Sequence, residues 1–140
     1  MVIRNIHRPP RAPESAAGAV LVRGSYDFYH FGCQGLDDRV WGCAYCSLQT
    51  IASWALQPGE PLGPPLEVAA HLKVQEALEH CGDKPAGFVG LCEWIGSFET
   101  GLALDSLFGL QCRILPFNCE AELLRAGGKL SQHFTRSAGL

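Results

Sequence analysis

The residues best suited to chemistry lie in a short segment around a cysteine in the first third of the chain. Cys43 follows Trp41 and Gly42, and it stands where an irregular stretch gives way to a helical pattern. The helix dipole and the free backbone N–H groups at a helix N-terminus stabilise a thiolate and make it nucleophilic. The same N–H groups can stabilise an oxyanion. The segment therefore predicts a nucleophilic Cys43, and a buried structural thiol is the alternative.

The same residues allow two other kinds of site. Cys43 and Cys46 form a C-x-x-C pair, which is the spacing of a dithiol redox site. Such a site follows an apolar strand, whereas residues 36–40 read Leu-Asp-Asp-Arg-Val, so redox chemistry is kept only as an alternative. Zinc would need two further ligands at useful spacing, and no second C-x-x-C pair occurs. We therefore expect no metal and no other cofactor.

The element that must carry Cys43 is a helix predicted over 43–55. Its apolar side chains recur every three or four residues: Tyr45, Leu48, Ala52 and Ala55. A second helix is expected over 67–80. Its end is indicated by the glycine and proline of the following segment, Gly82-Asp83-Lys84-Pro85. His71 and His80 fall on this second helix, and we expect both side chains to face solvent.

The remaining elements complete a helix-rich layout. A third helix is predicted over 96–108, and a fourth over 120–134 with a break at Gly127-Gly128. Strands are expected over 19–23 and 110–117. Two strands are too few for a finished sheet, so the pattern indicates an α/β or α+β chain with few strands.

Length and charge exclude several classes of protein. The chain has 140 residues, which fits one domain. Its net charge is −3, so there is no basic field that would hold nucleic acid. No apolar run approaches the roughly 18–20 residues that a membrane span needs. We therefore expect neither a nucleic-acid partner nor a membrane partner.

The first residues and the cysteines set the expected organisation and compartment. Residues 1–18 are rich in arginine and proline, and they predict a disordered tail before a domain over 19–140. The chain has seven cysteines, an odd number that fits poorly with a complete disulfide set. Because no secretion signal precedes them, free thiols and a cytoplasmic location are expected.

Two blocks of sequence resemble one known family. The first block runs from Tyr29-His30-Phe31 through Asp37-Asp38 to Trp41-Gly42-Cys43-Ala44-Tyr45 and Ser47-Leu48-Gln49-Thr50. The second block contains Gly82-Asp83-Lys84-Pro85, Phe88-Val89-Gly90 and Trp94-Ile95-Gly96-Ser97. In this order the blocks are similar to the ubiquitin-fold-modifier-specific proteases, over roughly residues 20–134. Within that family the chain looks most like the shorter member.

The resemblance implies an α+β, papain-like thiol protease with a ubiquitin-like modifier as its partner. Such enzymes process the modifier's precursor and release the modifier from lysine conjugates. Cys43 matches the family nucleophile, which attacks the modifier's C-terminal glycine and forms a thioester. A histidine would activate the thiol and an aspartate would orient that histidine. Trp94, an aromatic residue where a loop meets a helix, is the expected modifier contact, and a core tryptophan is the alternative.

The chain departs from the family pattern at several positions. The family's histidine and aspartate lie in an Asp-Pro-His motif, and no such motif occurs here. Phe31 stands where a tyrosine usually serves the oxyanion hole, and Cys46 and Cys92 stand where arginine is usual. We therefore expect a C-terminally truncated, incomplete papain-like domain containing the nucleophile-helix half, over 19–140. The expected outcome is a catalytically inactive homologue or truncated product that at most binds the modifier.

Overall fold

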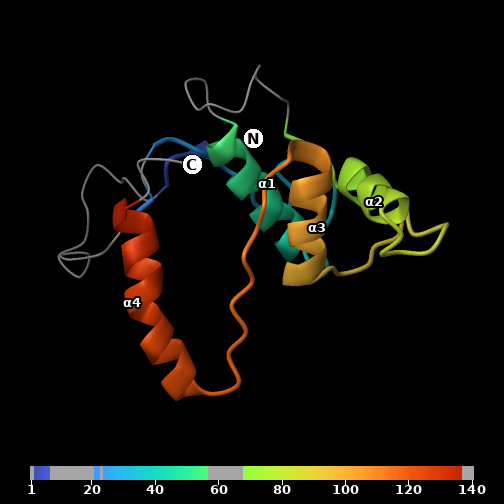
Figure 1. The fold of residues 1–140 in the computed structure, drawn as a ribbon. Helices are drawn as coiled ribbons and strands as arrows, with labels where there is room; N and C mark the ends of the chain where they lie inside the picture. Colours follow the sequence, from blue (N-terminus) through green and yellow to red (C-terminus); the bar gives the residue numbers. More distant parts are fainter. Residues whose placement is uncertain (1, 7–20, 23, 57–67, 137–140) are drawn as a thin grey trace.

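A computed structural model describes residues 2–6, 21–22, 24–56 and 68–136 (Figure 1). Two short strands and four helices follow one another along the chain: β1 (Ile3–Arg4), β2 (Asp27–Phe28), α1 (Cys43–Ala55), α2 (His71–His80), α3 (Ser97–Phe108) and α4 (Glu120–Arg136). Among these residues, no helix combines the length and the apolar character that crossing a membrane requires.

The core forms where α1, α2 and α3 meet. α3 packs against both α1 and α2, and α1 also contacts β2. The helical pattern that starts at Cys43 explains this arrangement, because it places Tyr45, Leu48 and Ala52 on one buried face of α1. These residues join a larger apolar cluster from α2, α3 and the loop between them: Val74, Leu78, Phe88, Ile95, Ala103 and Leu104.

The two strands attach the start of the chain to α1. They pair antiparallel, with Ile3 opposite Phe28. β2 is fixed to α1 by two side chains of the helix, since the Asp27 N–H donates to Ser53 Oγ at 2.9 Å and the Tyr29 N–H donates to Thr50 Oγ1 at 3.0 Å. Small hydroxyl side chains on α1 thus take the hydrogen bonds that another strand would supply.

The predicted disordered tail over 1–18 is corrected at its beginning. Residues 3–4 form β1 because their backbone groups find a partner strand at residues 27–28. Residues 7–18 lie outside the described part of the chain. Of the run 19–23 that was expected to be a strand, only residues 21 and 22 are described, and neither belongs to a strand.

Three other predictions change in the structure. Residues 110–117 form no strand, because no described segment pairs with them; they connect α3 to α4 as an irregular stretch (Figure 1). α4 runs without a break through Gly127 and Gly128, since two glycines weaken a helix without ending it. α2 begins at His71, and residue 67, its predicted start, lies outside the described residues.

Glu99 ties the loop between α2 and α3 to the start of α3. Glu99 Oε2 accepts the Gly96 N–H at 3.1 Å, which satisfies a backbone donor at the start of α3. Glu99 Oε1 accepts Lys84 Nζ at 2.8 Å. α3 ends at Gly109, whose φ of 67° lies in the left-handed region that glycine adopts freely. These contacts fix both ends of α3 and, with them, the loop that carries Trp94.

α4 stands apart from the three-helix core (Figure 1). It shares no extensive contact with another described helix or strand. Several of its apolar side chains are therefore left in water, and Leu124 is 72% exposed. In α3, by contrast, Ala103 and Leu104 are buried in the core, while Phe98 lies on the surface.

Replacing Leu48 should destabilise the whole molecule, because its side chain is fully buried at the centre of the core. Leu48→Ala is expected to lower the free energy of unfolding by about 2–5 kcal/mol, as transfer and cavity terms add. Urea unfolding measures this change. Ile51→Ala is the matched control on the same helix, because Ile51 is 46% exposed, and its change should stay below about 1 kcal/mol. Equal losses in the two variants would contradict this packing.

Candidate active site

Cys43 is the first residue of α1, and its side chain is exposed. Gly42 precedes it as the N-cap and supplies no side chain to cover the helix end, and the first turn carries no acidic residue. The N–H groups of the first turn have no acceptor inside the helix and point in the direction from which the chain enters. The thiol therefore lies at the positive end of the helix dipole, beside backbone donors that suit an oxyanion.

Trp94 contacts the thiol directly. Its indole Nε1–H donates to Cys43 Sγ at 3.1 Å, and its side chain is largely exposed, with 62% of its surface accessible. The neighbouring residues hold it in place, because Ile95 is buried in the core and the Glu93 carbonyl accepts the Tyr45 hydroxyl at 3.2 Å. Trp94 is thus an exposed aromatic beside the thiol rather than a core tryptophan.

Asp38 positions the turn that leads into α1. Its carboxylate Oδ1 accepts the Gly32 N–H at 2.8 Å, and its carbonyl accepts the N–H groups of Trp41 at 3.1 Å and Gly42 at 2.7 Å. The carboxylate packs so closely on Gly42 that a Cβ there would lie 2.6 Å from Asp38 Cβ and Cγ. Only glycine fits between Asp38 and Cys43, which explains the Gly-Cys pair at the helix start.

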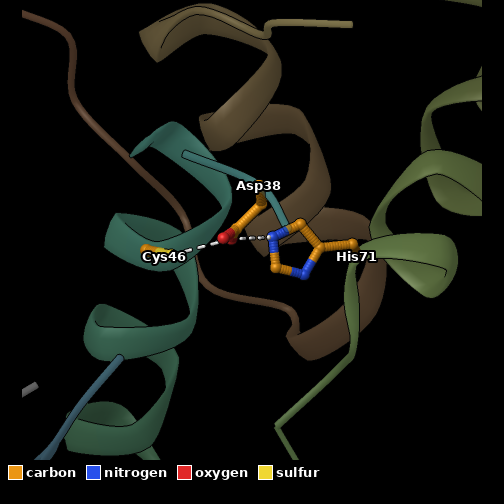
Figure 2. A group of neighbouring side chains, drawn as sticks. All are labelled: Asp38, Cys46 and His71. Carbon is orange, nitrogen blue, oxygen red and sulfur yellow. Dashed lines mark hydrogen bonds and ion pairs between the residues drawn. The ribbon is translucent and has the colours of Figure 1, made fainter. Parts of the chain in front are cut away.

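Two further side chains converge on the same carboxylate (Figure 2). The Cys46 thiol donates to Asp38 Oδ2 at 3.5 Å, and His71 Nε2 lies 3.1 Å from the same oxygen. All three residues are buried. Burial acts to raise the pKa of Asp38, but the bonds from Gly32 and Cys46 and the neighbouring His71 lower it overall.

His71 corrects the expectation that it faces solvent. It lies on the same side of α2 as Val74, Gln75 and Leu78, so the helix turns it into the core. Its ring stacks on Tyr45, with centroids 4.9 Å apart, and burial lowers its pKa. The spacing of His71 from Val74 and Leu78 is the sequence signal that would have placed it on the buried face. His80, in contrast, is exposed as predicted.

The described residues give Cys43 no general base. No described histidine or carboxylate contacts Cys43 Sγ, whose side-chain partner is Trp94. His30 faces the Phe31 carbonyl at 2.9 Å, and His71 is engaged by Asp38. Phe31 lies in an exposed turn, and its ring offers no hydrogen-bond donor. Its assignment to the oxyanion-hole position therefore stays a prediction.

Related proteins identify the family of the chain. The model of peptidase family C78 matches residues 17–140. The chain belongs to this family. Among the relatives, Ufm1-specific protease 2 of Gallus gallus is 43% identical over 133 residues, which cover 94% of this chain and 28% of that protein. The probable Ufm1-specific protease of Oryza sativa subsp. japonica is 38% identical over 135 residues, or 95% of this chain and 20% of that protein.

A solved structure supports the fold. The crystal structure of UfSP from C. elegans superposes with a TM-score of 0.73 at 32% sequence identity, and it covers 97% of this chain and 23% of that chain. The predicted α+β, papain-like fold with few strands is confirmed, as is the predicted family. The chain spans about a quarter of the length of the relatives that it matches.

Removing the indole donor should slow the reaction of Cys43 with electrophiles. The Trp94 N–H stabilises negative charge on the sulfur, so Trp94→Phe is expected to lower the rate of iodoacetamide alkylation at Cys43 by about threefold to tenfold. Mass spectrometry of peptides after timed alkylation measures the rate. Cys112 is an exposed internal control that lies away from this contact. An unchanged rate at Cys43 would show that the bond does not influence the thiol.

Cys46 should be inert in the folded chain. Burial and its bond to Asp38 raise the pKa of Cys46 to about 12, so about one thiol in 10⁴ is ionised at pH 8. Alkylation at pH 8 is therefore expected to label Cys43 and to spare Cys46 until urea unfolds the chain. Rapid native labelling of both thiols, or a Cys43–Cys46 disulfide under mild oxidation, would instead favour the dithiol redox alternative.

Proposed function

We propose that this chain binds a ubiquitin-fold modifier through the surface around Cys43 and Trp94, as the nucleophile-bearing part of a modifier-specific thiol protease. The observation that carries the proposal is an exposed thiol at a helix N-terminus with an exposed tryptophan donating to its sulfur. Membership of peptidase family C78, with relatives named Ufm1-specific proteases, supports the choice of partner.

The chemistry proposed for the thiol is acyl transfer. Cys43 Sγ attacks the carbonyl carbon of the modifier's C-terminal glycine, a C–S bond forms, and the free N–H groups at the start of α1 stabilise the oxyanion. The C–N bond to the lysine or precursor tail then breaks, the leaving amine takes up a proton, and water hydrolyses the thioester. Trp94 lies on the exposed side of the thiol, where it would cover an extended C-terminal tail.

Turnover needs a group that the described residues do not place at the thiol. A general base and acid contributes about 10²–10⁴-fold to such a reaction, and no described histidine contacts Cys43 Sγ. The 140-residue chain is therefore proposed to bind the modifier and to trap a reactive electrophile, but not to release product at an enzymatic rate. Processing of the precursor and of lysine conjugates is proposed for an arrangement in which a general base also reaches Cys43.

The test compares covalent capture with turnover. The chain is incubated with the modifier carrying a C-terminal electrophile, and intact mass is measured beside the Cys43→Ala variant. We expect one adduct on the wild type and none on Cys43→Ala. Cleavage of a modifier precursor, followed in parallel, should not exceed the rate of the Cys43→Ala chain.

Two controls separate docking from simple thiol reactivity. A short peptide with the same electrophile should react far more slowly than the whole modifier, because it lacks the folded docking surface. Circular dichroism confirms that each variant is folded. Failure of the folded wild type to form an adduct would overturn modifier binding, whereas cleavage that depends on Cys43 would show that the chain supplies a base of its own.

A further inference from the structure

Beneath the thiol, three side chains of different chemistry share one buried position. Asp38 Oδ2, Cys46 Sγ and His71 Nε2 all lie within 4.8 Å of one another, and each residue is more than nine-tenths buried. They come from three separate segments: the turn before α1, the first turns of α1, and the first residue of α2 (Figure 2). A carboxylate, a thiol and an imidazole are the three side-chain types that bind zinc in proteins.

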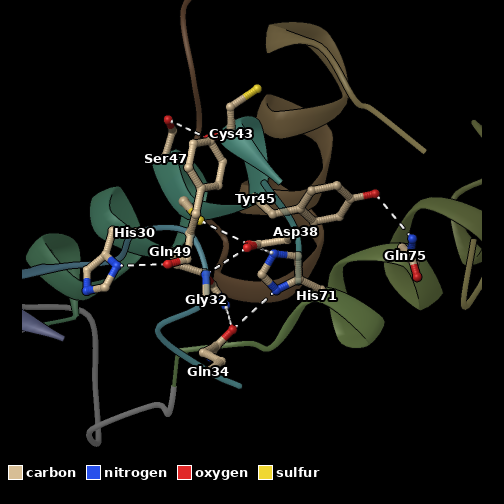
Figure 3. A network of polar contacts seen from close by, with 12 residues as sticks. His30, Gly32, Gln34, Asp38, Cys43, Tyr45, Ser47, Gln49, His71 and Gln75 are labelled. Atoms are coloured by element: carbon tan, nitrogen blue, oxygen red, sulfur yellow. Dashed lines mark hydrogen bonds and ion pairs between the residues drawn. The ribbon is translucent and has the colours of Figure 1, made fainter. Parts of the chain in front are cut away.

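A chain of hydrogen bonds determines which nitrogen of His71 carries the proton (Figure 3). The Ala69 carbonyl can only accept, so Gln49 must direct its Nε2 toward it, at 2.8 Å. The same Nε2 donates to Gln34 Oε1 at 2.9 Å, and this fixes the Gln34 oxygen as an acceptor. His71 Nδ1 lies 3.2 Å from that oxygen and must therefore be the protonated nitrogen.

With Nδ1 protonated, Nε2 is the His71 nitrogen that faces the Asp38 carboxylate. It lies 3.1 Å from Asp38 Oδ2, at the distance of an ion pair, and no other described residue gives this buried nitrogen a hydrogen bond. Two electron-rich atoms at that separation need a cation or a proton between them. Metal-binding histidines are commonly held in the same way, with Nδ1–H donated to a carbonyl oxygen and Nε2 directed at the metal.

We propose that Asp38, Cys46 and His71 bind a zinc ion. The site was not expected from the sequence, because its ligands are spread over 34 positions and follow no short motif. Zinc suits the mixed donor set better than magnesium or calcium, which prefer oxygen alone. Tetrahedral zinc places nitrogen and sulfur ligands about 3.5 Å apart, and the three ligand atoms here already lie within 4.8 Å of one another.

One of the three proposed ligands borders a cavity. His71 lines a cavity of about 460 Å³, together with Gln34, Trp41 and Gln75. Zinc sites with three protein ligands commonly keep a water molecule in the fourth position. Binding releases the Cys46 proton to solvent, because the thiolate is the ligand, so the affinity should increase with pH. The bound ion would join the turn before Cys43 to both α1 and α2.

The test uses cobalt as a spectroscopic substitute for zinc in the full chain. The sole-thiol version of the chain keeps Cys46 and has every other cysteine replaced by serine. The replaced residues are Cys33, Cys43, Cys81, Cys92, Cys112 and Cys119. One equivalent of Co²⁺ is expected to give a sulfur-to-cobalt charge-transfer band and the visible bands of tetrahedral Co²⁺. Zn²⁺ should displace the cobalt and raise the melting temperature, and a chelator should reverse both changes.

Two substitutions test the ligand and the residue that orients it. In the sole-thiol version, Cys46→Ser should abolish the charge-transfer band. Gln34→Ala keeps the three ligands but removes the acceptor for His71 Nδ1, and it should weaken zinc binding by about 10–100-fold, measured against a competing chelator. Lack of a charge-transfer band from the folded sole-thiol version would overturn the site. If Cys46→Ser leaves the zinc affinity unchanged, the metal binds to other groups. A proton, and not a metal ion, would then lie between Asp38 and His71.

Discussion

The carboxylate of Asp38 is buried, and the arrangement of the active-site region depends on which groups its two oxygens contact. One oxygen holds the Gly32 N–H, and the other faces Cys46 and His71. The carbonyl of the same residue holds the turn that leads into α1. An unpaired carboxylate in this position would cost several kcal/mol, so the surrounding donors are required for folding and also direct the start of α1. The position of Cys43 is thus a consequence of satisfying one buried charge.

The other half of the site depends on an amide side chain. Gln75 Nε2 donates to the Leu91 carbonyl at 2.8 Å, and its Oε1 accepts the Gly90 N–H at 2.8 Å. One side chain on α2 therefore satisfies two backbone groups of the loop, much as a neighbouring strand would. Trp94 follows three residues later, anchored by the buried Ile95. The thiol and the indole are placed by separate networks, one around Asp38 and one around Gln75. Tyr45 connects them, because its ring stacks on His71 and its hydroxyl bonds to Gln75 and to the Glu93 carbonyl.

The sequence predicted the elements whose residues interact locally. α1 was placed at its observed bounds because Tyr45, Leu48 and Ala52 repeat with the period of a helix, and the position of Cys43 at its start followed from that pattern. The strand over 110–117 was wrong because a β-prone run becomes a strand only beside a partner, which local pattern cannot reveal. The spacing of His71 from Val74 and Leu78 marks the buried face of α2, but its partners Asp38 and Gln34 lie more than 30 positions away and needed the folded chain. The contact of Trp94 with Cys43, across 51 positions, also needed the folded chain.

α4 carries its apolar side chains in water already in the native state, as at Leu123 and Leu124. Unfolding exposes less additional apolar surface at these side chains than at packed ones, so they add little to the heat-capacity increment, which arises from newly hydrated apolar groups. The increment per residue should therefore fall below the roughly 12–15 cal/mol/K that is typical of globular domains. A small increment flattens the dependence of stability on temperature. The three-helix core should supply most of the cooperative heat absorption, because α4 shares no extensive contact with another described helix or strand.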